Sequence, residues 1–253
     1  MILGFDIGNT NTLLGVYNDN EASPFATFRY VTNKQDDGDS LYRQTEKFIN
    51  EHAEDINGVG ISSVVPELNK HYAALCNARF KANHVFVSHA NKLSISIKYS
   101  DPAKLGADRI ANAEAVYRER QTDSIIIDIG TAATICVLLE NGVFEGGLIA
   151  PGIGTTIKAL SENASNLPEI VFERPDKLVA TDTVNALKSG FFYGWLSMLE
   201  GIINRIEGEY CKRFSVILTG GLAGKVQGDF TRPAVHDPLL TMRGIKYICD
   251  ANL

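Results

Sequence analysis

The sequence lacks the features of exported, membrane-spanning and disulfide-stabilised proteins. No apolar run is long enough to span a bilayer. The N-terminal stretch Met1–Asp6 has no basic segment and reaches an acidic residue at once, unlike a signal peptide. The four cysteines are far apart and form no CxxC pair, which argues against a zinc site or a disulfide framework. We therefore expect a cytoplasmic protein with reduced thiols and no membrane partner.

Positive charge is also scarce. The net charge is −6, and the densest basic stretch is Arg118–Arg120, which Glu119 interrupts. Nucleic-acid-binding proteins need a basic stripe, so nucleic acid is not expected as a partner. An anionic substrate would need local backbone N–H groups, an arginine or a metal ion to overcome the overall field. With 253 residues, 45% of them hydrophobic, the chain is long enough for two lobes of ordinary size.

The clearest internal pattern is a duplication. Gly4–Tyr17 and Ile126–Leu138 both read apolar, apolar, Asp, Ile, Gly, small polar residues and a second apolar run. Each copy predicts a β-hairpin, with the glycine and small polar residues in the turn. The matching aspartates, Asp6 and Asp128, are almost half the chain apart. Two copies are too few for a solenoid, so we expect two similar halves with a cleft between them.

The remaining pattern alternates strands with helices, which predicts a mixed α/β fold. The expected helices are Tyr42–His52, Pro66–Phe80 and a long stretch around Leu187–Ile206, and the expected strands outside the hairpins are Val59–Val65, Val85–Ser88 and Val216–Leu218. We place the boundary near Arg120–Ser124, giving an N-terminal lobe 1–120 and a C-terminal lobe 121–253.

The turn Asp6–Thr12 has suitable chemistry for nucleotide phosphates. Gly8 permits close backbone approach, and successive turn N–H groups can form an anion nest. Asp6 cannot hold a phosphate, but its carboxylate suits Mg²⁺, directly or through water. A single copy would fit a simple hairpin turn equally well. The second copy, and the Gly-rich turn Thr219–Gly224 after a late strand, favour a nucleotide site. A Walker A motif is absent.

A helix is predicted to begin around Gly106, with Asp108 and Arg109 in its first turn. Asp108 could simply be a helix N-cap. Alternatively, it could accept a proton while Arg109 binds an anion. A carboxylate is a sufficient base for phosphoryl transfer, because that chemistry depends mainly on positioning and charge neutralisation. The spacing of these residues does not distinguish the N-cap from the proton acceptor.

The ordered set of motifs over nearly the whole chain resembles the type III pantothenate kinases, which belong to the sugar-kinase/actin/heat-shock ATPase superfamily. The matching segments are Asp6–Asn11, Gly106–Arg109, Asp128–Ala132, Gly146–Gly152, Leu167–Pro168, Thr181–Thr183 and Thr219–Gly221. The resemblance implies a duplicated ribonuclease-H-like/actin-like ATPase fold. It also implies ATP-dependent phosphorylation of pantothenate to 4′-phosphopantothenate, the first step of coenzyme A biosynthesis, by a phosphotransferase acting on an alcohol group.

The resemblance also implies roles for individual residues. Asp108 would be the catalytic proton acceptor, and Asp128 would help hold a monovalent cation, K⁺ or NH₄⁺. The ATP-binding residues would be Asp6, Ile7, Gly8, Asn9, Thr10, Asn11, Thr12, Leu13 and Thr131. The pantothenate-binding residues would be Tyr99, Gly106, Ala107, Asp108, Arg109 and Thr183, with Arg109 near the carboxylate.

A homodimer is implied by the same family, in which the residue matching Thr183 reaches the partner's substrate. The stretch Leu187–Ile206 is apolar on more than one face, which is unusual for a surface helix. A helix buried within its own lobe would show the same pattern. The turn before Thr183 departs from the family, because it contains Asp182. This residue would add a negative charge beside an anionic substrate.

The residues are also compatible with two other functions. One is an ATP or polyphosphate hydrolase of the same superfamily, although water needs no acceptor element such as Gly106–Arg109. The other is a non-catalytic transcriptional accessory factor, which the acidic balance and the lack of a DNA-binding motif disfavour.

Overall fold

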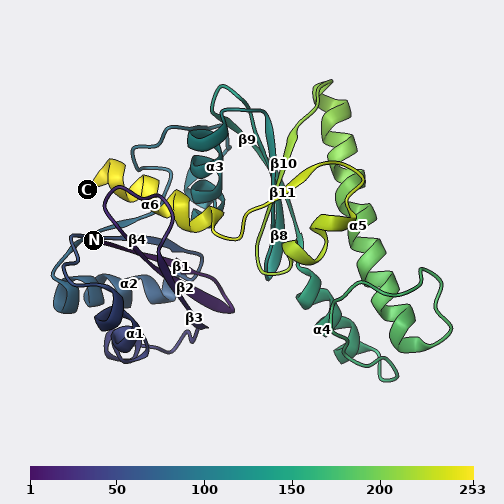
Figure 1. The fold of residues 1–253 in the computed structure, drawn as a ribbon, viewed down its shortest axis with the longest axis horizontal. Helices are drawn as coiled ribbons and strands as arrows, with labels where there is room; N and C mark the ends of the chain where they lie inside the picture. Colours follow the sequence, from purple (N-terminus) through teal and green to yellow (C-terminus); the bar gives the residue numbers. More distant parts are fainter. The chain divides into compact units, whose positions relative to one another are not determined.

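The computed structural model describes residues 1–253 as two compact units (Figure 1). The first unit comprises Met1–Gln121, Gly142–Phe144 and Leu239–Leu253, and the second comprises Thr122–Asn141 and Glu145–Pro238. The expected boundary between lobes 1–120 and 121–253 lies next to the point where the first unit gives way to the second, between Gln121 and Thr122. The compact units differ from them because the C-terminal segment and a short piece of the middle belong with the first unit.

The first unit is built on a mixed sheet with strand order β3-β2-β1-β4-β5. Strands β1 and β2 form the antiparallel hairpin, and β4 runs parallel to both β1 and β5. Its elements are β1 (Ile2–Ile7), β2 (Asn11–Tyr17), β3 (Ala26–Val31), α1 (Gly38–His52), β4 (Gly58–Ser63), α2 (Pro66–Leu75), β5 (Asn83–Phe86), β6 (Ser96–Ile97), α3 (Ala107–Arg120) and α6 (Leu240–Asn252).

Helices cover both faces of this sheet (Figure 1). Leu3, Phe5 and Ile7 alternate along β1 and share a buried apolar cluster with residues of α1 and α2. On the other face lies α6. A β-carbon on Gly60 would lie 2.6 Å from Ile245 of that helix, so the glycine lets α6 approach the sheet closely.

The last helix, α6, also crosses α3 with the two backbones in contact. A β-carbon on Gly244 would overlap the carbonyl oxygen of Ala111. Next to this crossing the Thr241 hydroxyl donates to Oδ1 of Asn112 over 2.8 Å, and the buried Tyr17 hydroxyl donates to the Met242 carbonyl over 2.7 Å. The C-terminal helix is therefore an integral part of the unit that contains the first hairpin.

The second unit repeats the plan around a sheet with the order β11-β10-β7-β8-β9-β6, in which the edge strand β6 belongs to the first unit. Strands β7 and β8 form the second hairpin, and β10 runs parallel to β7 and β11. Its elements are β7 (Ser124–Ile129), β8 (Ala132–Leu138), β9 (Val143–Pro151, whose first two residues lie in the first unit), α4 (Ile153–Asn163), α5 (Thr183–Tyr210), β10 (Ser215–Thr219) and β11 (Ala234–His236).

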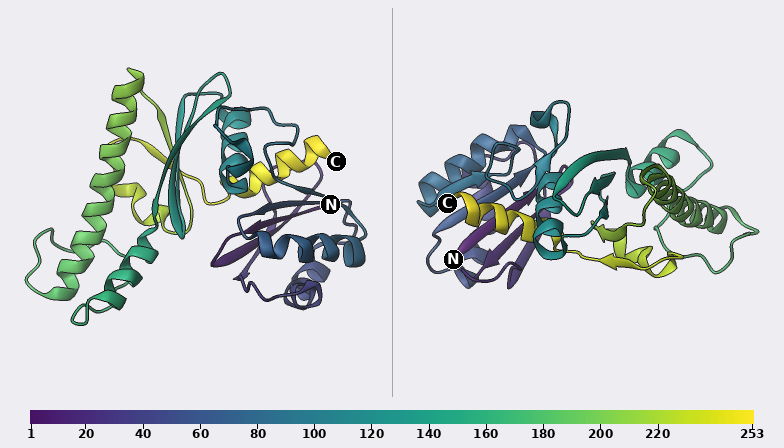
Figure 2. Two further views of the ribbon diagram at one scale, coloured as in Figure 1. Left: turned by 180° about the vertical axis from the view of Figure 1, so that it is seen from behind. Right: turned by 90° about the horizontal axis from the view of Figure 1, so that it is seen from above.

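Helix α5 runs along one side of this sheet, with α4 beside its N-terminal half (Figures 1 and 2). Phe192, Leu199 and Ile203 of α5 share one apolar cluster with Ile125 and Ile127 of β7. One stripe of α5 is therefore buried in its own unit, as the alternative interpretation of this helix required.

The expected hairpins, the helices at Tyr42–His52 and Leu187–Ile206, and the strands at Val59–Val65, Val85–Ser88 and Val216–Leu218 are present with shifted ends. The predicted helix Pro66–Phe80 consists of α2 followed by a π-helical turn over Cys76–Phe80. Strand β9 and helix α6 were not expected. None of the helices is long and apolar enough to cross a membrane.

Candidate active-site residues

The first phosphate-type turn is held in place by backbone hydrogen bonds. Gly8 N–H donates to the Asn11 carbonyl over 3.0 Å, and Thr32 N–H donates to the Thr10 carbonyl over 3.0 Å. A β-carbon on Gly8 would lie 2.9 Å from that Asn11 oxygen, so only glycine allows the turn to close this tightly. Asn9 and Thr10 form its exposed tip.

Two residues of the predicted ATP-binding run have side chains turned into the protein. Ile7 belongs to the apolar cluster of the first unit. Thr12 is fully buried, and its hydroxyl lies 2.9 Å from the hydroxyl of Thr32. At these two positions only the main chain is suitably placed to meet a phosphate, and the Thr12 side chain instead ties the hairpin to the residue that follows β3.

Asp108 lies in the first turn of α3, after the N-cap residue Gly106. Its Oδ1 accepts a hydrogen bond of 2.8 Å from the Arg109 N–H. Burial raises the pKa of the Asp108 carboxyl above its ordinary value, although the Arg109 N–H and the Arg109 charge act in the opposite direction. A carboxylate with a raised pKa is a better proton acceptor, which suits it to general-base chemistry.

Arg109 is only 5% exposed. The centre of its guanidinium lies 5.7 Å from the ring centroid of Tyr99 and 5.5 Å from that of Phe144. The first unit thus brings together Tyr99, Gly106, Asp108 and Arg109, four of the predicted pantothenate residues. Phe144 was not among the predicted residues, because no local pattern distinguishes it from an ordinary core phenylalanine.

Asp128 lies near the end of β7, beside the Gly-rich turn of the second unit. Its neighbours in register are Thr134 on β8 and Thr219 on β10. Gly220 has φ +90°, and a β-carbon there would lie 2.5 Å from Oδ1 of Asp128. The sequence separates Asp128 and Gly220 by most of one lobe, but the parallel pairing of β7 with β10 places them in contact.

Thr131 lies at the exposed tip of the second hairpin, where the start of α4 closes onto the turn. Its carbonyl accepts hydrogen bonds from Gly152 N–H over 2.9 Å and from the Thr155 hydroxyl over 2.7 Å. A β-carbon on Gly152 would overlap the Gly130 carbonyl oxygen. Gly152, the last residue of the Gly146–Gly152 motif, therefore lets the chain pack directly on the second phosphate-type turn.

No three acidic, histidine or cysteine side chains converge on a point that could hold a metal ion. The candidate cation ligands, Asp6 and Asp128, are single carboxylates in separate units. A single carboxylate fits Mg²⁺ that is bound mainly through phosphate oxygens and water. The Asp6 carboxylate therefore fits a divalent cation that takes its other ligands from phosphate and water.

Asp182 is the N-cap of α5, and its negative charge stabilises the start of that helix. Its carboxylate accepts from the Asn185 N–H over 3.0 Å and from Nδ2 of Asn185 over 2.8 Å. The backbone hydrogen bond from Asn185 is the main reason why the pKa of Asp182 lies below its ordinary value. Thr183, the next residue, is exposed at the first position of the helix.

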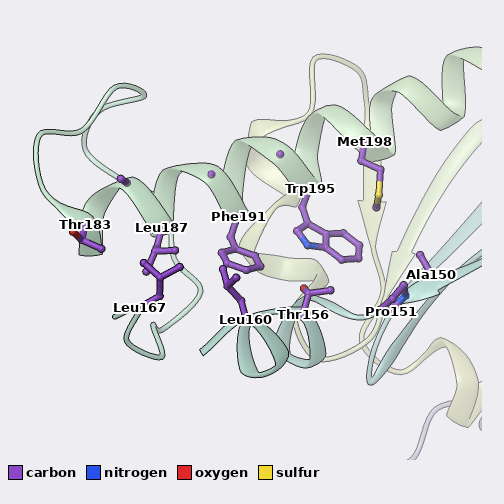
Figure 3. Close-up of a pocket in the computed structure, with 13 residues that line it drawn as sticks. Ala150, Pro151, Thr156, Leu160, Leu167, Thr183, Leu187, Phe191, Trp195 and Met198 are labelled. Atoms are coloured by element: carbon purple, nitrogen blue, oxygen red, sulfur yellow. The ribbon is translucent and has the colours of Figure 1, made fainter. Parts of the chain in front are cut away.

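An apolar groove of about 740 Å³ lies between α4 and α5 (Figure 3). Leu160 and Leu167 face Leu187 and Phe191 across it, and Thr183 lies at its end. Gly190 and Gly194 also line it, and a β-carbon on either would meet no atom within 4 Å. At these two glycines, therefore, α5 has no close neighbour within the second unit.

Solved structures of several kinds of protein share the fold of this chain. One is an activator of 2-hydroxyisocaproyl-CoA dehydratase from Clostridium difficile with bound ADPNP (TM-score 0.59, 15% identity, 98% of this chain and 94% of that chain). Another is a ROK family glucokinase from Streptomyces griseus in complex with glucose and AMPPNP (TM-score 0.54, 14% identity, 98% of each chain). The likeness confirms the duplicated two-lobe ATPase fold that the family resemblance implies.

Sequence comparison is more specific. A family model described as type III pantothenate kinase matches residues 2–205. A type III pantothenate kinase from Halalkalibacterium halodurans is 37% identical, with both chains covered in full. Another, from Geobacillus thermodenitrificans, is 38% identical over 100% of this chain and 98% of its own. The chain therefore belongs to the type III pantothenate kinase family.

Proposed function

We propose that this chain transfers the γ-phosphate of ATP to the 4′-hydroxyl of pantothenate in the cytoplasm, the first step of coenzyme A biosynthesis. Membership of the family supports the reaction. None of the four cysteines forms a disulfide, which fits a reducing compartment.

The observation that carries the acceptor assignment is the adjacency of a basic carboxylate and a buried arginine at the start of α3. Asp108 accepts the proton of the 4′-hydroxyl while that oxygen forms a bond to the γ-phosphorus. The bond from the γ-phosphorus to the bridging oxygen breaks, and ADP leaves with the bond's electron pair. Arg109 binds the pantothenate carboxylate, an interaction that its planar, permanently charged guanidinium favours.

The two Asp-Ile-Gly turns take the nucleotide. The main chain from Asp6 to Leu13 contacts the phosphates, and Thr131 in the second unit makes its own contact with ATP. Asp6 would hold Mg²⁺, directly or through water, and Asp128 would help to hold K⁺ or NH₄⁺. The chemistry that the divalent ion would supply is neutralisation of charge on the phosphates. The tight packing of Gly220 against Asp128 supports a fixed carboxylate at that position.

The active enzyme is a homodimer joined through α5. An apolar groove of this size would be unusual on a monomer's surface, and exposed glycines on a helix allow another helix to approach closely. A second copy seated there would bring its own Thr183, at the end of the groove, to the pantothenate of its partner.

The experiment that tests the reaction measures ADP release with ATP and Mg²⁺, with and without pantothenate, in K⁺ and then in Na⁺ buffer. Turnover that requires both pantothenate and K⁺ is expected. ADP release that ignores pantothenate would replace the kinase with a hydrolase, and no release in either buffer would contradict both enzymes.

A further inference from the structure

The Phe144 ring lies against the one arginine that the proposed reaction assigns to the substrate carboxylate. Phe144 is fully buried, and its ring centroid is 5.5 Å from the Arg109 guanidinium carbon. We propose that Phe144 is a positioning residue, whose ring fixes the plane of the Arg109 guanidinium in the orientation that receives a carboxylate. The inference rests on the proposed function and adds to it a residue outside the expected pantothenate pocket.

A ring does more for a buried guanidinium than aliphatic packing can. Burial removes water from the Arg109 charge, and the negative face of an aromatic ring replaces part of that lost stabilisation. Both ring distances, to Phe144 and to Tyr99, fall within the range of about 6 Å in which this attraction operates. A stacked guanidinium keeps a fixed plane, and a fixed plane is what two parallel hydrogen bonds to one carboxylate require.

Strand pairing within the first unit fixes the positions of the Tyr99 and Phe144 rings relative to each other. Ile97 of β6 is in register with Phe144 of β9. Lys98 N–H donates to the Phe144 carbonyl over 2.9 Å, and Ser96 N–H donates to the Gly142 carbonyl over 2.9 Å. Tyr99 directly follows Lys98, so these hydrogen bonds hold the two aromatic positions side by side.

The helix that carries Arg109 anchors both strands of this pair. Gly142 has φ +82°, and a β-carbon there would lie 2.8 Å from the ring of Tyr117, so the start of β9 packs directly on α3. The buried Glu114 of α3 accepts two contacts of 2.9 and 3.1 Å from the Ser94 N–H, which precedes β6. The rings and the arginine thus share one support within the first unit, so the ring contacts of Arg109 form before any substrate binds.

The test compares Phe144→Leu, which removes the ring, with Phe144→Tyr, which keeps it. Each is assayed with pantothenate and with pantothenol, in which a neutral alcohol replaces the carboxylate. Phe144→Leu is expected to raise KM for pantothenate about 10-fold, with kcat and the KM for ATP within about twofold. Its kinetics with pantothenol should match wild type. Phe144→Tyr should melt at a lower temperature because it buries a hydroxyl, yet keep the wild-type KM for pantothenate.

Phe28→Leu is the control, because that ring stacks on Tyr30 and Phe48 and no guanidinium lies over its face. It should lower the melting temperature without changing either KM. In an Arg109→Lys background, Phe144→Leu should add little to the KM for pantothenate. If Phe144→Leu does not fold, Phe144→Met takes its place.

Equal losses with pantothenate and pantothenol, or full additivity with Arg109→Lys, would overturn the positioning role and leave the kinase intact. A wild-type protein that does not phosphorylate pantothenate would instead refute the proposed function, and the inference with it.

Discussion

Oδ1 of Asp108 occupies the space beside Gly106 where a β-carbon would stand, because that carbon would lie 2.5 Å from the oxygen. Gly106 has φ −58° and ψ 138°, which any residue can adopt. Space, and not backbone conformation, therefore requires glycine at the N-cap of α3 if the Asp108 carboxylate is to keep this position. The residue before the helix determines where the predicted base can place its carboxylate.

Gly106→Ala should consequently reduce catalysis far more than stability. The added methyl group turns the Asp108 carboxylate away from its position, and kcat should fall about 100-fold, the scale of a lost general base. Steady-state kinetics and thermal melting measure the two effects. Gly154→Ala is the control, since a β-carbon there meets nothing within 4 Å. Equal kcat in both variants would contradict the proposed position of the base.

Asp108→Asn should abolish measurable phosphate transfer and stabilise the fold at neutral pH. Because burial raises the pKa of Asp108, the folded state binds this proton more tightly than the unfolded state does. Wild-type stability therefore falls as pH rises from the ordinary carboxyl pKa through the raised one, and the variant lacks that loss. Urea unfolding at a series of pH values should show the variant's advantage growing from acid to neutral pH. A constant difference would show that Asp108 does not titrate as proposed.

The same raised pKa shapes the activity profile of the wild type. The base works only as the carboxylate, so kcat/KM for pantothenate should fall on the acid side around a pKa above the ordinary value of 3.8. Initial rates between mildly acidic and neutral pH measure it. An acid limb at or below the ordinary value would indicate that the carboxyl is solvated during catalysis.

Gly220→Ala should disturb the site of the monovalent cation and the fold together. Its backbone at φ +90° disfavours any other residue, and a β-carbon would press on Asp128 Oδ1 and the Ile129 backbone. The free energy of unfolding should fall by about 2 kcal/mol. The K⁺ concentration for half-maximal rate should rise, because the carboxylate moves. Gly221→Ala, where a β-carbon meets nothing within 4 Å, should change neither quantity.

Mixing two inactive variants tests whether Thr183 serves the partner subunit. Asp108→Asn and Thr183→Ala homodimers should each be impaired. Subunit exchange would give heterodimers with one intact site, built from Asp108 of one chain and Thr183 of the other. The mixture should regain about a quarter of wild-type activity if exchange is random. No recovery, with exchange verified by differently tagged chains, would place Thr183 in its own subunit's site.

Local patterns predicted the parts of this protein that local chemistry determines. The alternation and turn residues around Gly8 and Gly130 predicted both hairpins, and the start of α3 at Gly106 was predicted from its first turn. The burial of Thr12 could not be predicted, because the hydroxyl's partner is Thr32, beyond the next strand.

Long-range packing determined the rest. Nothing near Phe144 in the sequence indicates that it meets Arg109, since the contact depends on β9 pairing with β6. Likewise, Gly220 resembles any loop glycine until the pairing of β7 with β10 places it against Asp128. The family motifs include both Gly220 and Asp128, but they do not give the reason that these two residues occur together.

The return of α6 to the first unit has a consequence for the order of events during synthesis. The hairpin with Asp6 and the helix with Asp108 leave the ribosome early, but the helix that covers Gly60 and crosses Ala111 is translated after the whole second unit. Until then one face of the first sheet lacks its cover. The first unit therefore cannot complete its fold until its final 13-residue helix has been synthesised. A premature stop just before Leu240 should remove catalysis, even though every predicted site residue has been made.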